Sequence, residues 1–144
     1  MRDIKFRGKH KNPYGDKWVH GYFAMKDGRH VIIMPHAEDY IKSLNEPKPI
    51  PQISVEHTID VNTLGQYTGL KDKHGTEIYE GDIVKVKNCQ YHIGQVIYDT
   101  EYTEYEIEID KNTVFSISVC YGDASELDIE VIGNIYDNPE LLGE

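Results

Sequence analysis

The chain has 144 residues, of which 39% are hydrophobic and 28% are charged, and its net charge is −10. This composition is typical of one globular domain or of two small subdomains, and it excludes a disordered chain, which would contain fewer apolar residues. The negative charge argues against a general nucleic-acid binder, because a polyanionic backbone would repel it. No stretch approaches the roughly 20 apolar residues of a membrane helix and no secretory signal opens the chain, so we expect a cytoplasmic protein without a membrane partner.

The first third of the chain predicts an N-terminal β subdomain over residues 1–52. Ile4 and Phe6 alternate with charged residues, which is the pattern of a strand with one buried face. Residues 17–34 predict a hairpin with Asp27-Gly28 in its turn, because glycine accepts the positive φ that tight turns require. These two segments are expected to form one small sheet.

A proline-rich connector ends this subdomain. Residues 36–45 are compatible with one or two helical turns, and Pro47, Pro49 and Pro51 follow at alternate positions. Prolines spaced in this way lack backbone donors and favour extended geometry, so the segment is not expected to join a sheet.

Residues 53–144 predict a barrel-like β-domain, so the whole chain is expected to be all-β with little helix. Short apolar runs separated by turn residues recur at the spacing of a barrel or sandwich. They cover residues 53–61, 64–70, 82–87, 93–99, 105–110, 114–121 and 129–136. Asp137 or Asn138 followed by Pro139 then predicts a short helical turn at the end of the chain.

The stretch Thr68–Lys87 fits either turn structure or chemistry. Glycine tolerates a left-handed backbone and Asp accepts hydrogen bonds from turn amides, so we expect structural turns at Gly69, Gly75, Gly81 and Asp82. The alternative is a carboxylate-based, metal-dependent enzyme that uses Asp72, Glu77, Glu80 and Asp82. We favour the structural interpretation, because short strands direct neighbouring carboxylates to opposite faces. We therefore expect no catalytic residue, no metal site and no cofactor.

Acidic residues recur at every second position of the predicted strand 104–110. In extended form this strand has Tyr105, Ile107 and Ile109 on one face and carboxylates on the other, namely Glu104, Glu106, Glu108 and Asp110. Carboxylates in a row repel one another unless a cationic partner faces them. Two explanations stay open: an exposed edge strand that carries charge against aggregation, or a docking surface for a basic protein patch.

The charge is also uneven along the chain. Residues 1–30 carry a net charge of +5, which leaves −15 for residues 31–144. A basic region with Arg2, Lys5 and Arg7 could meet the acidic strand of a neighbouring copy, which predicts a homo-oligomer. The alternatives are a host or phage protein as partner, nucleic acid bound by the basic N-terminal face, or a solvated surface with chance asymmetry.

Three segments together resemble the YopX family of bacteriophage and prophage proteins. They are MRDIKFRG (1–8), LGQYTGLKDKHGTEIYEGDIVKV (64–86) and EVIGNIYDNPELL (130–142), in the family's order. The resemblance implies a mostly-β protein, carried by phages of low-GC Gram-positive hosts, with no established biochemical activity and no catalytic residue to carry over. Residues 12–53 resemble the family least. The sequence thus predicts a phage- or prophage-encoded, non-catalytic interaction or assembly protein.

Overall fold

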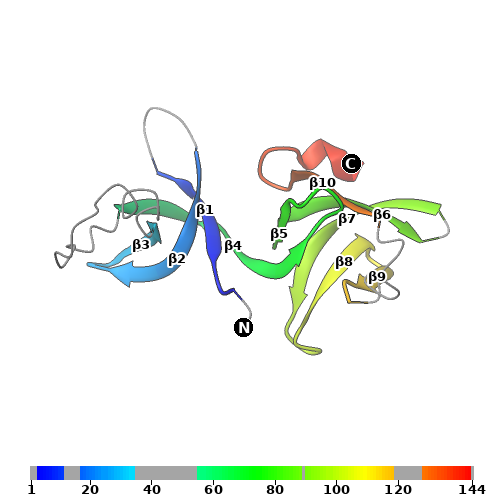
Figure 1. The fold of residues 1–144 in the computed structure, drawn as a ribbon, viewed down its shortest axis with the longest axis horizontal. Helices are drawn as coiled ribbons and strands as arrows, with labels where there is room; N and C mark the ends of the chain where they lie inside the picture. The colour runs from blue at the N-terminus through cyan, green and yellow to red at the C-terminus, as the bar shows by residue number, and fades with distance from the viewer. Residues whose placement is uncertain (1–2, 12–16, 35–54, 89, 119–127, 144) are drawn as a thin grey trace, which may run out of the picture. The chain divides into compact units, whose positions relative to one another are not determined.

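A computed structural model describes residues 3–11, 17–34, 55–88, 90–118 and 128–143 (Figure 1). These residues form strands, turns and one short 3-10 helix, so the predicted all-β class is confirmed. The predicted helical turns at 36–45, the proline-rich connector and Arg2 lie outside the described residues.

The strands form two antiparallel sheets. In the first half of the chain, β1 spans Phe6–His10, β2 Trp18–Lys26, β3 Arg29–Met34 and β4 Val55–Lys71. The remainder adds β5 (Glu77–Tyr79), β6 (Asp82–Asn88), β7 (Gln90–Asp99), β8 (Glu104–Asp110), β9 (Thr113–Ser116), β10 (Ile129–Asn134) and the 3-10 helix η2 (Pro139–Leu142). One sheet has the order β1-β2-β3-β4-β5 with an additional β1–β4 pairing, and the other has the order β10-β6-β7-β8-β9.

The described residues divide into two compact units inside strand β4. The N-terminal unit is Ile4–Leu64, and the C-terminal unit begins at Gly65. The sequence predicts two short strands, 53–61 and 64–70, where the structure has the single strand β4 of 17 residues. Asp60 and Asn62 resemble turn residues, but the Asp60 carboxylate accepts a local hydrogen bond from the Asn62 amide at 3.1 Å and the chain stays extended.

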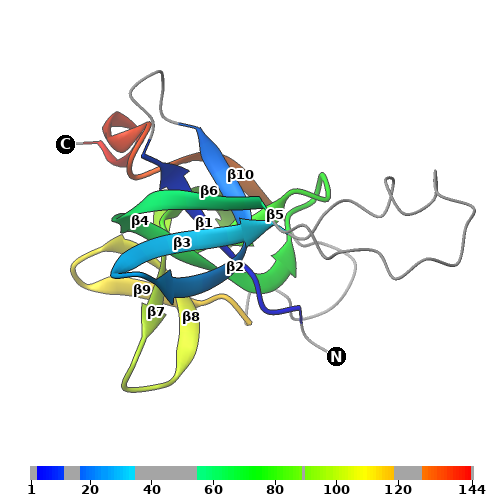
Figure 2. The ribbon, with the colours of Figure 1, turned by 90° about the vertical axis from the view of Figure 1, so that its left-hand side faces the viewer.

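The N-terminal unit contains the predicted hairpin. Lys26 pairs with Arg29 across a two-residue turn in which Asp27 and Gly28 have φ of 49° and 72°, so the predicted turn is confirmed. Figure 2 shows β2 and β3 side by side in this unit. Its core consists of Val19, Ile32 and Ile59, with Phe6, Phe23 and Leu64 packed against them. The ring-closing β1–β4 pairing lies in this sheet, since the long strand β4 reaches β3 and β1.

The C-terminal unit has a sheet with one apolar and one charged face. Its core comprises Ile78, Val84, Val86, Val96, Tyr105, Ile107, Ile117 and Ile129. The opposite face of the sheet, which we call the outer face, carries Lys85 and Lys87 on β6 and the carboxylates of β8. Helix η2 lies over part of the outer face, because a Cβ at Gly133 would meet Asn138 Oδ1 at 2.6 Å and Leu141 Cδ1 at 2.9 Å. The expected C-terminal helical turn is thus present, with Pro139 at its start.

Candidate interaction surface

Asp72 joins the turn after β4 to the edge of strand β10. Its Oδ1 atom accepts hydrogen bonds from the amides of His74 at 2.8 Å and Thr76 at 2.9 Å, and Oδ2 accepts one from the amide of Val131 at 3.0 Å. Burial alone would raise the pKa of Asp72, but the bonds from Val131, Thr76 and His74 outweigh it and hold the pKa below its ordinary value. Asp72 is therefore an ionised cap for three backbone donors.

The other three carboxylates of this stretch bond to separate groups. Asp82 Oδ2 accepts the Tyr79 amide at 2.8 Å, and Asp82 is only 1% exposed. Glu80 Oε2 accepts the Gln66 amide at 2.8 Å, and Glu77 Oε2 accepts the Tyr79 hydroxyl at 2.8 Å. Among the described residues, no three His, Cys, Asp or Glu side chains gather as metal ligands would. This arrangement favours turn and strand geometry over acid–base chemistry.

The glycines of the same stretch occupy left-handed backbone. Gly69, Gly75 and Gly81 have φ of 90°, 83° and 81°. Gly69 lies where the β4–β5 register shifts between Tyr67 and Lys71. A Cβ at Gly75 would meet nothing within 4 Å, whereas a Cβ at Gly81 would lie 3.1 Å from Tyr136 Cε2. Of Gly75 and Gly81, only Gly81 therefore combines a left-handed backbone with close packing.

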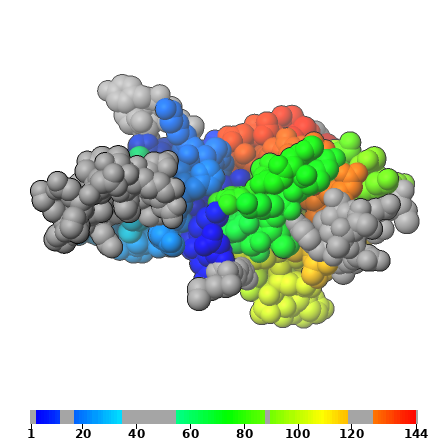
Figure 3. All heavy atoms as spheres, in the orientation of Figure 1, coloured from blue at the N-terminus to red at the C-terminus, as the bar shows by residue number. Residues whose placement is uncertain are grey.

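Strand β8 alternates as its sequence predicts. Tyr105 and Ile107 are 7% and 0% exposed and belong to the core, while the intervening glutamates are half-buried on the outer face. Figure 3 shows atoms of the β7–β8 hairpin, in yellow-green, at the surface of the C-terminal unit. Asp110 departs from this set, because it caps the next turn by accepting the Asn112 amide at 2.8 Å. That bond, with Thr113, holds the pKa of Asp110 below its ordinary value.

The edge-strand interpretation of β8 is wrong. Tyr105 pairs with Tyr98 of β7, and Ile107 pairs with Phe115 of β9, so β8 has a partner strand on each side. The turn after Asp110 returns the chain as β9, which covers the side of β8 that the sequence alone leaves open. Protection of a free edge therefore does not explain the charges of β8.

Four carboxylates gather on the outer face, and we call this group the acidic face: Asp99, Glu104, Glu106 and Glu108. Asp99 lies directly opposite Glu104 across the β7–β8 pair, and its Oδ1 atom also accepts the turn amides of Glu101 at 2.6 Å and Tyr102 at 3.0 Å. Burial raises the pKa of Glu106, and the charges of Asp99 and Glu104 raise it further. Glu104 accepts the Ser116 hydroxyl at 2.8 Å. Within the described part of the chain, no Lys or Arg forms an ion pair with the acidic face.

Two basic residues near the N-terminus, Arg7 and Lys9, lie over the ring of Trp18. Arg7 is buried, and its guanidinium carbon lies 4.7 Å from the ring centroid of Trp18. Lys9 Nζ lies 5.7 Å from the same ring, and Lys5 is half-buried. An ion pair between Arg7 and another copy would compete with its stacking on Trp18.

Three lysines and one tyrosine gather in the structure, although the sequence did not predict that they would. We call this group the lysine–tyrosine cluster: Lys73, Lys85, Lys87 and Tyr91. Lys85 Nζ and Lys87 Nζ lie 4.4 Å and 5.8 Å from the Tyr91 ring centroid. Alternation in the sequence places both lysines on one face, but only the pairing of Lys87 with Tyr91 brings the ring beside them.

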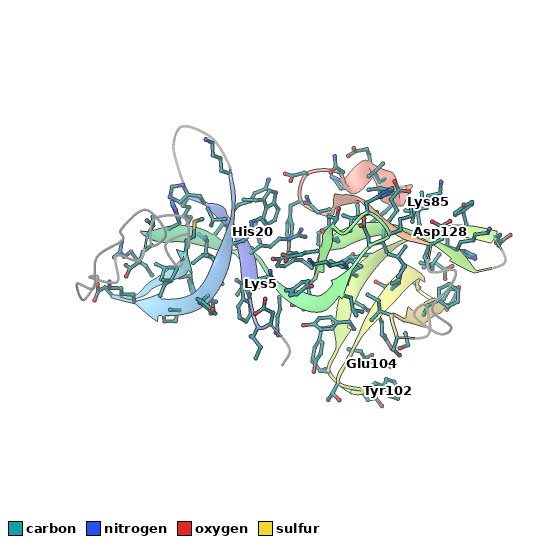
Figure 4. All side chains as sticks on the ribbon, viewed as in Figure 1. Lys5, His20, Lys85, Tyr102, Glu104 and Asp128 are labelled. Atoms are coloured by element: carbon teal, nitrogen blue, oxygen red, sulfur yellow. The ribbon has the colours of Figure 1, made fainter. Side chains whose placement is uncertain are left out.

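Two carboxylates hold this cluster in place: Asp128, which directly precedes β10, and Glu130, which lies within β10. The Tyr91 hydroxyl donates to Asp128 Oδ2 at 2.9 Å. Lys73 Nζ lies 2.7 Å from Asp128 and 3.1 Å from Glu130, and hydrogen bonds to both raise its pKa. The bonds from Lys73 and Tyr91 lower the pKa of Asp128. Figure 4 shows Lys85 and Asp128 at one end of the sheet and Glu104 near the other.

Fold and surface together define an all-β protein of two small units built from antiparallel strands. The chain belongs to the YopX family, because the family model described as YopX protein matches residues 14–143. A crystal structure of protein EF1440 from Enterococcus faecalis is similar, with a TM-score of 0.51 and 23% identity over 99% of each chain. No curated protein matches the sequence. Among the described residues, no helix has the length and apolar character needed to cross a membrane.

Proposed function

We propose that this chain is a phage- or prophage-encoded, non-catalytic interaction protein of the host cytoplasm that binds a cationic protein surface on its acidic face. Membership of the YopX family supports the phage or prophage origin. The observation that carries the proposal is the position of β8. An internal strand has no free edge to protect, yet its outer side carries Glu104, Glu106 and Glu108.

Electrostatics favour a bound partner at this surface. Like charges that face one another across a strand pair destabilise the sheet, and Asp99 faces Glu104 in this way. The raised pKa of Glu106 reflects the same repulsion together with burial. Lysine or arginine side chains of a partner would relieve the repulsion and would pair with carboxylates that are already fixed in place by the sheet.

The turn carboxylates support the non-catalytic part of the proposal. Asp72 and Asp82 are both buried, and both accept hydrogen bonds from backbone amides. A catalytic acid, base or ligand needs lone pairs directed at a substrate or a metal. In Asp72, both oxygens are instead directed at amides of the protein itself.

The test is affinity capture of the tagged full-length chain from host cells, with the wild type beside Glu106→Gln/Glu108→Gln. The matched control is Asp27→Asn/Glu56→Gln, which changes the net charge equally at two exposed positions of the N-terminal unit. We expect wild type and control to retain the same protein partner, and the acidic-face variant to lose it. A partner retained equally by all three chains would contradict the proposal, and so would the absence of any retained partner together with the absence of self-association through the acidic face.

A further inference from the structure

Opposite charges occupy opposite ends of the outer face. Lys87 pairs with Tyr91 and Lys85 with Ile93 at the start of β7, whereas Asp99 pairs with Glu104 at its end. Nine residues of extended strand span about 26 Å between these ends. The outer face is therefore basic at one end and acidic at the other.

The two lysines at the basic end are available to a partner. Lys73 forms ion pairs with Asp128 and Glu130, whereas Lys85 and Lys87 form no close ion pair with any described residue. Glu130 nevertheless lies directly opposite Lys85. Besides the hydrogen bonds from Lys73, the charges of Lys85 and Lys87 lower the pKa values of Glu130 and Asp128, respectively. Lys87 is exposed and Lys85 is half-buried against the ring of Tyr91. Their stems and the ring thus hold two ammonium groups at a defined place on the sheet.

Exposed apolar side chains lie beside the charged residues, because Tyr91 and Ile93 pair with Lys87 and Lys85, and Val114 pairs with Glu108. Tyr91, Ile93 and Val114 are 53%, 40% and 43% exposed, and they come from β7 and β9. Exposed apolar side chains flanked by charge are the usual composition of a protein contact surface.

We propose that the cationic partner of the acidic face is a second copy of this chain, whose Lys85 and Lys87 meet that face. This proposal rests on the proposed function above and names its partner. Two outer faces related by a two-fold axis satisfy both charged ends at once, because each basic end then lies against the other copy's acidic end. Tyr91, Ile93 and Val114 form the dry part of the contact.

Helix η2 limits the extent of this contact. It covers the outer face at Gly133, where Ile83 is fully buried, and it packs against β7. The open part of the face is therefore limited to the end with Lys85 and Lys87 and to the carboxylates of β8. A surface of this size buries less than about 1,200 Å² in total, which corresponds to a weak or transient dimer. The association is therefore expected at high protein concentration and at low salt.

The experiment is a charge swap read out by sedimentation velocity of the full-length chain at about 100 μM in low salt, where weak dimers are populated. One variant, Glu106→Lys/Glu108→Lys, makes the outer face basic at both ends. The other, Lys85→Glu/Lys87→Glu, makes it acidic at both ends. The control, Asp27→Lys/Glu56→Lys, changes the net charge as much as the first variant at two exposed positions of the N-terminal unit, and circular dichroism verifies that every variant is folded.

We expect a dimer for the wild type and the control. For each swap variant alone, the dissociation constant of the dimer should rise at least about tenfold, because like charges then meet at both ends. A 1:1 mixture of the two swap variants should sediment as a dimer again. A monomeric wild type, or folded swap variants that stay monomeric when mixed, would overturn the proposal.

These outcomes are separable from those of the capture experiment. If the wild type is monomeric but captures a different protein through Glu106 and Glu108, the proposed function stands and self-association fails. If swap-dependent dimers form but capture recovers only the chain itself, both proposals hold, with the second copy as the partner.

Discussion

The C-terminal unit contains two acidic regions of similar composition and opposite character. In the turn region, Asp72 and Asp82 are buried and accept backbone hydrogen bonds, so these carboxyl groups stabilise the fold. On the acidic face, Glu104 and Glu106 lie among like charges, and burial with those charges raises the pKa of Glu106. Number and spacing of carboxylates are alike in both regions, so the role of each is set by the donors around it.

This difference distinguishes carboxylates that stabilise the fold from carboxylates that can bind a partner. A turn carboxylate already has its donors, and its removal leaves amides without an acceptor. A strand carboxylate on the acidic face has a repulsive neighbour, and its removal relieves that repulsion. Replacing a carboxylate should therefore lower the free energy of unfolding in the turn region and raise it on the acidic face.

The largest effect is expected at Asp72. Asp72→Ala leaves three backbone amides, including that of Val131 in β10, without their acceptor. We expect a loss of about 2–3 kcal/mol in the free energy of unfolding, because bonds to a charged acceptor are stronger than neutral ones. Urea unfolding followed by circular dichroism measures it. An unchanged midpoint would show that the turn does not depend on this carboxylate.

The same residue predicts a dependence on pH. Because the pKa of folded Asp72 lies below its unfolded value, its stabilisation is present above the unfolded pKa and is lost as the pH falls through the folded pKa. The difference in stability between wild type and Asp72→Asn should therefore be largest near neutral pH and shrink in acid. A difference that grows below pH 4 would contradict the assignment.

A second effect concerns the turn glycines. Gly81→Val and Gly75→Val both place a β-branched residue at positive φ, which costs about 1–3 kcal/mol. Gly81→Val should cost more, because its Cβ also meets Tyr136 while Gly75 has open space. Thermal unfolding of the pair isolates the packing contribution. Equal losses would show that Tyr136 moves aside freely.

The smallest effect is expected on the acidic face, and it has the opposite sign. Since the pKa of folded Glu106 is raised, this group contributes stability below its unfolded pKa and loses it as the pH rises through the folded pKa. Glu106→Gln should therefore raise stability slightly at pH 7, by less than about 0.5 kcal/mol, with the gain vanishing near pH 4. A clear destabilisation at pH 7 would mean that Glu106 holds the fold.

Sequence patterns predicted the elements whose structure depends only on residues close together in the chain. The hairpin at Asp27-Gly28 and the alternation of β8 follow from a two-residue turn and a period of two. The position of β8 inside the sheet was not predictable, because it depends on how the following strand pairs. The continuity of β4 was also missed, since Asp60 and Asn62 are turn residues by composition.

The surface clusters show the same limit. Asp72 and Val131 are 59 residues apart in the sequence, so the cap on β10 has no local signature. Lys85 and Lys87 are visible as an alternating pair, but Tyr91 joins them only through the register of β6 and β7. Contacts between strands, which sequence patterns do not encode, decide which charges gather.

Carboxyl labelling read by mass spectrometry tests most directly whether the acidic face is a binding surface. The full-length chain is labelled in host-cell extract and, separately, as purified protein at low concentration and high salt. The account predicts that Glu104, Glu106 and Glu108 are protected in the extract, while the exposed carboxylates of Asp27 and Glu140 react equally in both samples. Equal labelling of the three β8 glutamates in both samples would contradict it.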